Sequence, residues 1–367
     1  MNSTEKKALG VGIIGAGRVS RDHAYAVQRH AGLQLVGVAE PDEEKRSRFV
    51  QRYRCDACAN HRDLLAKDGV DMVLVGVPHW LHAPVVKDVL NAGVHCMVEK
   101  PMAMTVEECR GMVAAAEENG VRLMVGHTQH FFPANIAVKG LVARGEIGEI
   151  VIAAQAWYKP FGLAGRPPWM LDREKGGGMW LMNGAHMLDC LMWFVDSEVA
   201  AVKGSVTNKI VKQKADDSIV AFIEFTSGVC ATLAHSGSKR PEPPPPEQWF
   251  TTEVTGTEGS ARVISYEGKA WVNTQGEDKP VTQQRNAEQE QAVRAFLNAE
   301  AGRTADAPMA QSAIEQTSGI VDEVAAFAEA VALGYEPPVS NRHALAVMAT
   351  ILAVEESSRT GREVRLR

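Results

Sequence analysis

The sequence predicts an α/β fold with two domains. The N-terminal domain has a parallel sheet covered by helices on both faces, and the C-terminal α/β domain has a large, mostly antiparallel sheet with one open face. The chain has 367 residues, more than one core usually accommodates. Its first 130 residues alternate short apolar segments with helical periodicity, and later runs alternate apolar and polar residues. We expect domains at 1–130 and 131–367, with the C-terminal helix at 343–360 near their junction.

The elements of the first domain follow from these apolar segments and from glycines that commonly end helices. Gly32, Gly93 and Gly120 stand at such positions. The expected strands are 11–14, 35–39, 72–77, 95–98 and 122–125, and the expected helices are 20–30, 42–53, 81–91 and 106–119. Short apolar strands between helices indicate a parallel sheet.

The first strand runs into Gly15-Ala16-Gly17, and a helix pattern follows. Gly15 permits a tight turn, and Gly17 lets the backbone approach a pyrophosphate that the helix N-terminus can bind. The third small position is Ser20, where Gly or Ala is usual. A generic turn between strand and helix is the alternative interpretation, but the order of strand, turn, helix, strand and acid favours a dinucleotide site.

The acid in that order is Glu40, at the end of the second strand. A carboxylate there can accept hydrogen bonds from an adenosine ribose and repel a 2′-phosphate. The sequence therefore predicts a nicotinamide dinucleotide as cofactor and favours NAD. NADP is the alternative, because Arg18 follows the glycines and could meet a 2′-phosphate.

Composition excludes several classes of protein. The net charge is −6 without a basic stripe, which argues against nucleic-acid and membrane partners. Residues 1–9 are polar, and no run of 18 apolar residues occurs. We expect a soluble, cytoplasmic protein.

The six cysteines do not suggest a disulfide framework. Cys55 and Cys58 form a Cys-x-x-Cys with His61 close behind, which is either a metal or redox site or a loop before the third strand. Because no second ligand pair stands at zinc spacing, we favour the loop and expect no metal.

The second domain is expected to be a mixture of helices and alternating strands. The expected helices are 133–144, 179–194, 314–333 and 343–360, the expected strands are 150–158, 199–208, 218–226, 229–235, 251–255, 261–266 and 270–273, and a Gly/Pro-rich loop covers 159–178. The proline-rich segment 239–247 is expected to be an exposed, extended loop.

Two βα loops carry chemistry at the carboxyl edge of the expected parallel sheet, where ligands bind in such folds. Glu99-Lys100-Pro101 ends the fourth strand, and Lys100 could donate to a substrate oxygen or relay its proton; a surface pair with Glu99 is the alternative. After the third strand, Pro78 would shape a wall against the cofactor. His79 and His82 are expected to contact it, unless they are helix residues that meet no ligand.

A glycine triplet, 176–178, precedes a helix that carries Asn183, His186 and Asp189. The triplet lets backbone lie close to a ligand. Histidine titrates near neutral pH, so His186 could take a hydroxyl proton while Asp189 orients its ring. The alternative is a packed helix face with a buried structural histidine.

The loop that starts at Trp157 could form a pocket wall, with Phe161 within it. Aromatic faces suit sugar rings, and basic groups suit a carboxylate. Packing at the sheet edge and solvated charges are the alternative. The expected substrate-binding residues are Asn183, Tyr158, Arg166, Trp169 and Arg173.

Together these motifs resemble the glucose–fructose oxidoreductase, inositol dehydrogenase and MocA-like (Gfo/Idh/MocA) family, over nearly the whole chain. The resemblance is carried by Gly15-Ala16-Gly17 with His23, Pro78-x-x-x-His82, Glu99-Lys100-Pro101, the glycine triplet followed by His186-x-x-Asp189, and the ending 356–364. It implies a Rossmann domain, NAD(P)-dependent oxidation of a secondary alcohol on a sugar or cyclitol, and dimers or tetramers formed through the open sheets. It also implies Lys100 and His186 as catalytic residues. The expected cofactor contacts are Gly15, Ala16, Gly17, Arg18, Val19, Glu40, Pro78, His79, His82, Glu99 and Lys100.

The chain departs from the family pattern at three places, the first of which is Glu40, where aspartate is commoner. Met182 stands where many members have an aspartate, with Asn183 beside it, and asparagine cannot accept a proton at neutral pH. His130 stands where arginine is frequent. Three functions therefore remain: a dehydrogenase of a cyclic polyol or sugar, a non-redox glycosidase that oxidises transiently with tightly held NAD, and a catalytically reduced dinucleotide-binding regulator.

Overall fold

The computed structural model describes residues 8–160, 166–210, 212, 214–238, 249–281 and 285–366. The chain forms two compact units, Met1–His127 with Ile320–Leu345, and Thr128–Gly319 with Ala346–Arg367. The division expected at residue 130 places all later residues in the second domain. The structure instead groups Ile320–Leu345 with the first unit.

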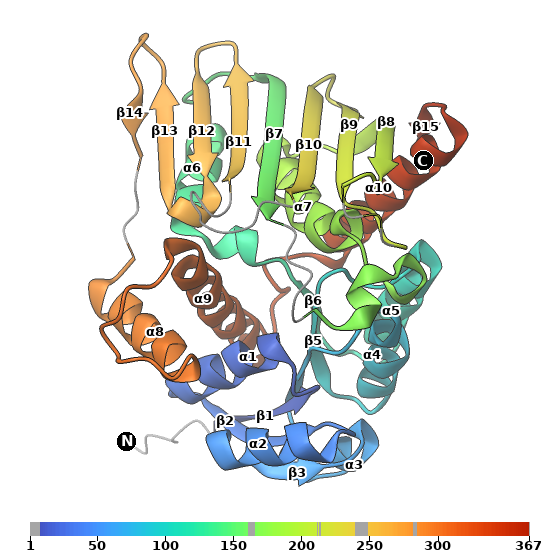
Figure 1. Cartoon of the computed structure of the whole chain (residues 1–367), viewed down its shortest axis with the longest axis vertical. Helices are drawn as coiled ribbons and strands as arrows, with labels where there is room; N and C mark the ends of the chain where they lie inside the picture. Colours follow the sequence, from blue (N-terminus) through green and yellow to red (C-terminus); the bar gives the residue numbers. More distant parts are fainter. Residues whose placement is uncertain are drawn as a thin grey trace. The chain divides into compact units, whose positions relative to one another are not determined.

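The first unit is a six-stranded sheet in the order β3-β2-β1-β4-β5-β6, with every neighbouring pair parallel (Figure 1). All residues of β4 and β6 are buried, as in a sheet covered on both faces. The strands are β1 Leu9–Ile14, β2 Leu33–Ala39, β3 Asp56–Cys58, β4 Met72–Val75, β5 His95–Glu99 and β6 Leu123–Gly126; the helices are α1 Arg18–Arg29, α2 Glu43–Tyr53, α3 His61–Leu65, α4 His82–Asn91 and α5 Val106–Glu118. The predicted Rossmann fold is confirmed.

The prediction that Cys55 and Cys58 lie in a loop is wrong, because a strand begins between them. Asp56–Cys58 is the edge strand β3, and only one of its three side chains is buried, so it lacks the apolar run that marked the other strands. Burial raises the pKa of the Cys55 thiol to about 11. His61 begins α3, with its Nε2 atom 2.8 Å from a carboxylate oxygen of Asp88.

The second unit is built on a nine-stranded sheet in the order β14-β13-β12-β11-β7-β10-β9-β8-β15 (Figure 1). Among the described residues, β7 and β10 run parallel, and the other neighbouring pairs are antiparallel. The strands are β7 Ile150–Pro160, β8 Val199–Thr207, β9 Ser218–Phe225, β10 Cys230–Ser238, β11 Trp249–Gly256, β12 Ser260–Ile264, β13 Lys269–Asn273, β14 Lys279–Pro280 and β15 Val364–Arg365. The predicted, mostly antiparallel sheet is confirmed.

One face of this sheet is covered and the other is open. The helices α6 (Pro133–Ala143) and α7 (Ala185–Val195) pack on the sheet, and the end of α10 (Asn341–Thr360) bonds to β8 through two serine side chains. On β9, Val220 and Phe222 are exposed while Ile219 and Ile223 are buried, so the strand alternates between the two faces.

The remaining helices match the expectations in part. The helix expected at 179–194 begins with a π-helical turn, Trp180–Gly184, before α7, and α9 spans Gln311–Leu333. Helix α8, Ala287–Glu300, was not expected from the sequence. The proline-rich segment 239–247 and Phe161 lie outside the described residues. Within the described part of the chain, no helix has the length and apolar character needed to cross a bilayer.

Candidate functional site

The turn after β1 has the shape that a phosphate needs. Gly15 has φ +93°, and a Cβ there would lie 2.5 Å from the Gly76 carbonyl oxygen, so only glycine fits. At Gly17, the nearest atom to an added Cβ is 3.9 Å away, which leaves open space against the backbone. Gly17 is also the N-cap of α1 and makes no side-chain cap. The N–H groups at this helix N-terminus therefore suit a pyrophosphate.

Glu40 stands beside this turn at the carboxyl end of β2. Its Oε2 accepts a hydrogen bond from the Ala16 N–H at 2.9 Å, and its Oε1 accepts one from the Asp42 N–H at 3.0 Å. The bond from Ala16 ties the carboxylate to the glycine turn, and the bond from Asp42 fixes it within its own loop. The residue combination expected for a dinucleotide ribose and pyrophosphate is therefore present in one place.

The side chain of His82 lies in the protein interior. It is fully buried, with Nδ1 2.8 Å from the Pro101 carbonyl oxygen and Nε2 3.0 Å from that of Val77. Burial lowers the pKa of its ring. His82 therefore joins the loop after β4 to the loop after β5, with each ring nitrogen facing a backbone carbonyl. His79 is also buried, with its ring centroid 5.5 Å from that of His82.

The Glu99-Lys100-Pro101 segment follows β5, with a cis peptide between Lys100 and Pro101. Oε1 of Glu99 lies 3.3 Å from Nε2 of the buried His23. Burial raises the pKa of Glu99, but the hydrogen bond and charge of His23 and the charge of Lys100 outweigh it, so the pKa lies below its usual range. Glu99 is therefore a carboxylate at neutral pH, and Lys100, only partly buried, follows it.

In the second unit, two glycines of the triplet, Gly177 and Gly178, are required by the protein's own packing. A Cβ on Gly177 would lie 2.4 Å from the Met170 carbonyl oxygen, and one on Gly178, where φ is +108°, would lie 2.2 Å from Oδ1 of Asp216. The expected close approach of these glycines is therefore made to other parts of the chain.

Asp216 caps the π-helical turn that follows. Its Oδ2 accepts a hydrogen bond from the Trp180 N–H at 2.6 Å, and its backbone carbonyl accepts one from the Met179 N–H at 3.2 Å. Burial raises the pKa of this carboxyl group to about 6. A residue far along the chain therefore fixes the start of the helix that bears His186.

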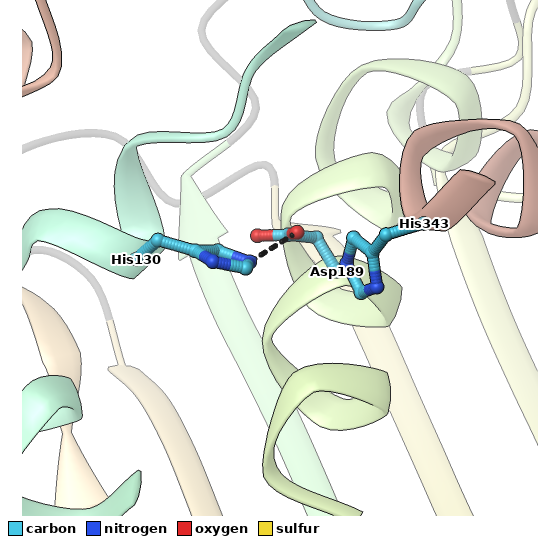
Figure 2. A group of neighbouring side chains, drawn as sticks. All are labelled: His130, Asp189 and His343. Carbon is cyan, nitrogen blue, oxygen red and sulfur yellow. Dashed lines mark hydrogen bonds and ion pairs between the residues drawn. The ribbon is translucent and has the colours of Figure 1, made fainter. Parts of the chain in front are cut away.

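Asp189 engages a different histidine from the one expected. Figure 2 shows the carboxylate facing His130, with Oδ1 2.8 Å from Nε2, and it also draws His343 from the first turns of α10. The His130 ring stacks on Trp193, with centroids 4.2 Å apart. The structure thus gives Asp189 a hydrogen-bond partner on the 3₁₀ turn Thr128–Phe131, which was not expected from the sequence.

The rings of His186 and His235 lie near the buried Trp157, and Asn183 joins this group through its contact with His235. The Trp157 ring centroid lies 6.2 Å from that of His186 and 5.3 Å from that of His235. Asn183 Nδ2 lies 3.0 Å from His235 Nε2. We call these four residues the Trp157 cluster. His235 was not predicted from the sequence, where its one signal is an inward-facing position on β10.

The other expected substrate-binding residues are placed differently. Tyr158 alternates with Trp157 on β7 and is exposed on the open face of the sheet. Arg173 forms two hydrogen bonds with Glu355, at 2.7 and 2.6 Å. Arg166 and Trp169 are half-buried. Asn183 is therefore the one expected substrate contact that the structure places in the Trp157 cluster.

Both units match known families. Residues 9–127 match the oxidoreductase family with an NAD-binding Rossmann fold, and residues 136–262 match the GFO/IDH/MocA C-terminal domain. Lys100 belongs to the first unit and His186 to the second.

Curated relatives share about a quarter to a third of their residues with this chain. The 1,5-anhydro-D-fructose reductase of Ensifer adhaerens is 31% identical over 68% of this chain and 74% of its own length. The 1-carboxy-3-chloro-3,4-dihydroxycyclohexa-1,5-diene dehydrogenase of Comamonas testosteroni is 27% identical over 74% of this chain, and the match spans 63% of the relative.

The fold is shared with solved structures. GenD2 from gentamicin A biosynthesis, solved in complex with NAD, superposes with a TM-score of 0.80 at 23% identity and covers 100% of this chain and 99% of its own. At this identity the likeness shows the fold.

Proposed function

This chain belongs to the Gfo/Idh/MocA family of NAD-binding Rossmann oxidoreductases, and on that premise we propose that it oxidises a secondary alcohol on a sugar, cyclitol or related cyclic polyol. The observation that carries the proposal is the position of Lys100. It follows β5 at the carboxyl edge of the parallel sheet whose β1 leads into the glycine turn. Ligands of open α/β sheets bind at this edge.

The binding residues have separate tasks in this proposal. Gly15, Gly17 and the N-terminus of α1 hold the pyrophosphate, and Glu40 holds the adenosine ribose. The bound nicotinamide supplies a hydride acceptor. A carboxylate anchored by two backbone N–H groups disfavours a 2′-phosphate, which supports NAD as the cofactor.

The catalytic residues act on the alcohol group. Lys100 donates a hydrogen bond to the substrate oxygen, and His186 takes the hydroxyl proton as the carbon loses its hydride. The electron pair of the O–H bond then forms the carbonyl. Asn183, in the same cluster as His186, binds a substrate hydroxyl without acting as a base.

A substrate panel tests the reaction class. Polyols, sugars, glycosides and sugar acids are incubated with the protein and NAD, and the NADH absorbance band is followed. Net NADH formation supports the dehydrogenase. Glycoside cleavage without net NADH supports the non-redox alternative. Binding of NAD with neither outcome supports a regulator.

Lys100→Ala and His186→Ala test the catalytic assignment. Each variant should lower kcat/KM by roughly 10²–10⁴-fold, because acid–base groups typically contribute that much. The double variant should lose less than the product of the two losses, because residues that act on one proton fail together. Calorimetry should show NAD binding retained.

Lys87→Ala, at an exposed position on α4, is the matched control and should keep full activity. Near-full activity in both Lys100→Ala and His186→Ala would remove the catalytic assignment and leave the fold and cofactor standing.

A further inference from the structure

His235 and the Asn183 side chain form a pair whose hydrogens can be assigned from chemistry. His235 is 1% exposed, and its Nδ1 lies 2.6 Å from the Trp157 carbonyl oxygen. A carbonyl oxygen can only accept, so Nδ1 carries the hydrogen. The ring is thereby held as the Nδ1–H tautomer whenever it is neutral.

The environment keeps this ring neutral. Burial lowers the pKa of His235 to about 3, and the positive charge of Lys159 acts in the same direction. The Nε2 atom therefore carries a lone pair at neutral pH and can only accept. The Asn183 atom that lies 3.0 Å from it must be the donor Nδ2.

The second hydrogen of that amide is also used. Asn183 Nδ2 lies 3.4 Å from Sδ of Met179, which is fully buried and is a weak acceptor. No residue in the described part of the chain donates a hydrogen bond to Asn183 Oδ1. The orientation of the amide therefore leaves an oxygen with two lone pairs as its binding atom.

We propose that His235 is a positioning residue that orients the Asn183 amide so that Oδ1 accepts a hydrogen bond from a substrate hydroxyl. The choice of this group rests on the proposed function, because Asn183 and His186 share the Trp157 cluster. The site then selects a substrate with a hydroxyl donor next to the reacting alcohol, and it disfavours a bare carboxylate or a carbonyl at that point.

The same pair of side chains predicts that an aspartate at position 183 would change the protonation of His235. Asn183→Asp removes both amide hydrogens and places a carboxylate against the Nε2 lone pair. The ring must then bind a second proton to satisfy both neighbours, so the variant should raise the pKa of His235 by roughly one to three pH units.

The first test is nitrogen NMR of the histidine side chains in the whole protein, which needs no substrate. The wild-type His235 signal, assigned by its loss in His235→Gln, should show a protonated Nδ1 and a bare Nε2 from pH 8 down to about 5. Asn183→Asp should show both nitrogens protonated at a higher pH. Asn91→Asp, an exposed asparagine on α4, changes the net charge equally and should leave the signal unchanged. A protonated Nε2 in the neutral wild-type ring would overturn the proposal.

The second test uses an alcohol that the panel shows to be oxidised. His235→Leu should raise KM by roughly 10- to 100-fold with a smaller change in kcat, because the acceptor is misoriented. His235→Gln can still donate to Trp157 and accept from Asn183, so it should stay within a few-fold of wild type. His235→Leu in an Asn183→Ala background should add little. Equal losses in both His235 variants, or additive losses, would overturn the positioning role, whereas the absence of any oxidised alcohol would refute the proposed function and leave the NMR result to decide the tautomer.

Discussion

Glu40 shows how one carboxylate both builds a turn and selects a ligand. Its two oxygens accept hydrogen bonds from the N–H groups of Ala16 and Asp42, so the charge is anchored beside the glycine turn. An anchored charge cannot move away from an incoming phosphate. Its like-charge contact with a 2′-phosphate costs roughly 1–3 kcal/mol, or about 5–150-fold in affinity.

We therefore expect NAD to bind about 5–150-fold more tightly than NADP. Glu40→Gln keeps an acceptor for the turn and should narrow this ratio. Calorimetric titration with both dinucleotides measures the four dissociation constants. Arg18→Ala is the companion variant, because the exposed Arg18 could attract a 2′-phosphate. Equal dissociation constants for NAD and NADP in the wild-type protein would contradict the prediction.

Asp216 couples local structure to pH. Burial raises the pKa of its carboxyl group from 3.8 to about 6 in the folded protein. The folded state therefore binds more protons than the unfolded chain between about pH 4 and pH 6, and this residue's contribution to the free energy of unfolding falls as the pH rises through that range.

Asp216→Asn should remove this fall in the free energy of unfolding at higher pH. The amide oxygen can still accept from the Trp180 N–H, so the free energy of unfolding should rise by roughly 1–3 kcal/mol at pH 7.5 and stay nearly unchanged at pH 4. Urea denaturation at several pH values measures the difference. Asp306→Asn, at an exposed position, is the control. A variant with the same pH dependence as the wild type would refute the assignment.

At the scale of elements, distant residues decide how helices begin. The π-helical turn at Trp180–Gly184 starts where Asp216 accepts hydrogen bonds, although that residue lies between β8 and β9. The first turns of helix α9 are also bound by a residue outside the helix. Arg285 Nε lies 3.2 Å from Oε2 of Glu315, and the two side chains are only 5% and 6% exposed.

Arg285→Ala should lower the free energy of unfolding by roughly 3–5 kcal/mol, because it leaves the Glu315 carboxylate buried without its cation. Adding Glu315→Gln should recover part of the loss. Arg144→Ala removes an ion pair with Glu146 whose side chains are 62% and 41% exposed, and it should cost less than about 1 kcal/mol. Similar losses in Arg285→Ala and Arg144→Ala, measured by urea denaturation, would contradict the argument.

At the scale of the whole molecule, the open sheet face is the feature that points to association. Ile152 and Tyr158 on β7 and Val220 and Phe222 on β9 are 42–63% exposed. The small residues of β10 lie between these strands, with Thr232 paired to Phe222 and Ala234 paired to Val220. An exposed apolar surface of this kind commonly marks an interface.

We expect a homodimer or homotetramer formed through this sheet. Val220→Lys with Phe222→Lys should shift the protein to the mass of a single chain, because buried lysines would face each other across a symmetric interface. Light scattering at micromolar concentration measures the mass. Leu333→Lys is the matched control, since Leu333 is 58% exposed at the end of α9. A monomeric wild-type protein would contradict the prediction.

Local patterns predicted the Rossmann elements well. The strands and helices of the first unit begin and end within about two residues of the predicted bounds, apart from β3 and α3. Apolar runs and terminal glycines are signals that neighbouring residues carry, so no long-range contact is needed to find them. The edge strand β3 has three residues and one buried side chain, too few to show a period.

Short motifs in the sequence were sufficient to propose residues for the candidate site. The glycine turn, Glu40, Lys100 and His186 were proposed because their residue types and spacing are local properties of the chain. The partners of Asn183 and Asp189 were not predicted from the sequence. His235 approaches Asn183 across 52 residues, and His130 approaches Asp189 across 59. Such pairs depend on strand register and helix packing, which bring together residues whose positions in the chain carry no mutual signal.

The same distinction separates the chemistry of the chain from the orientation of its groups. Residue types and their spacing were sufficient for the α/β class, the parallel sheet and the dinucleotide turn, because backbone geometry and burial act over a few neighbouring residues. Packing settled the return of Ile320–Leu345 to the first unit, the pairing of Asp189, and the direction of the Asn183 amide. A hydrogen bond in a buried cluster is fixed by which donors and acceptors meet there, and that meeting exists only once the strands and helices have assembled.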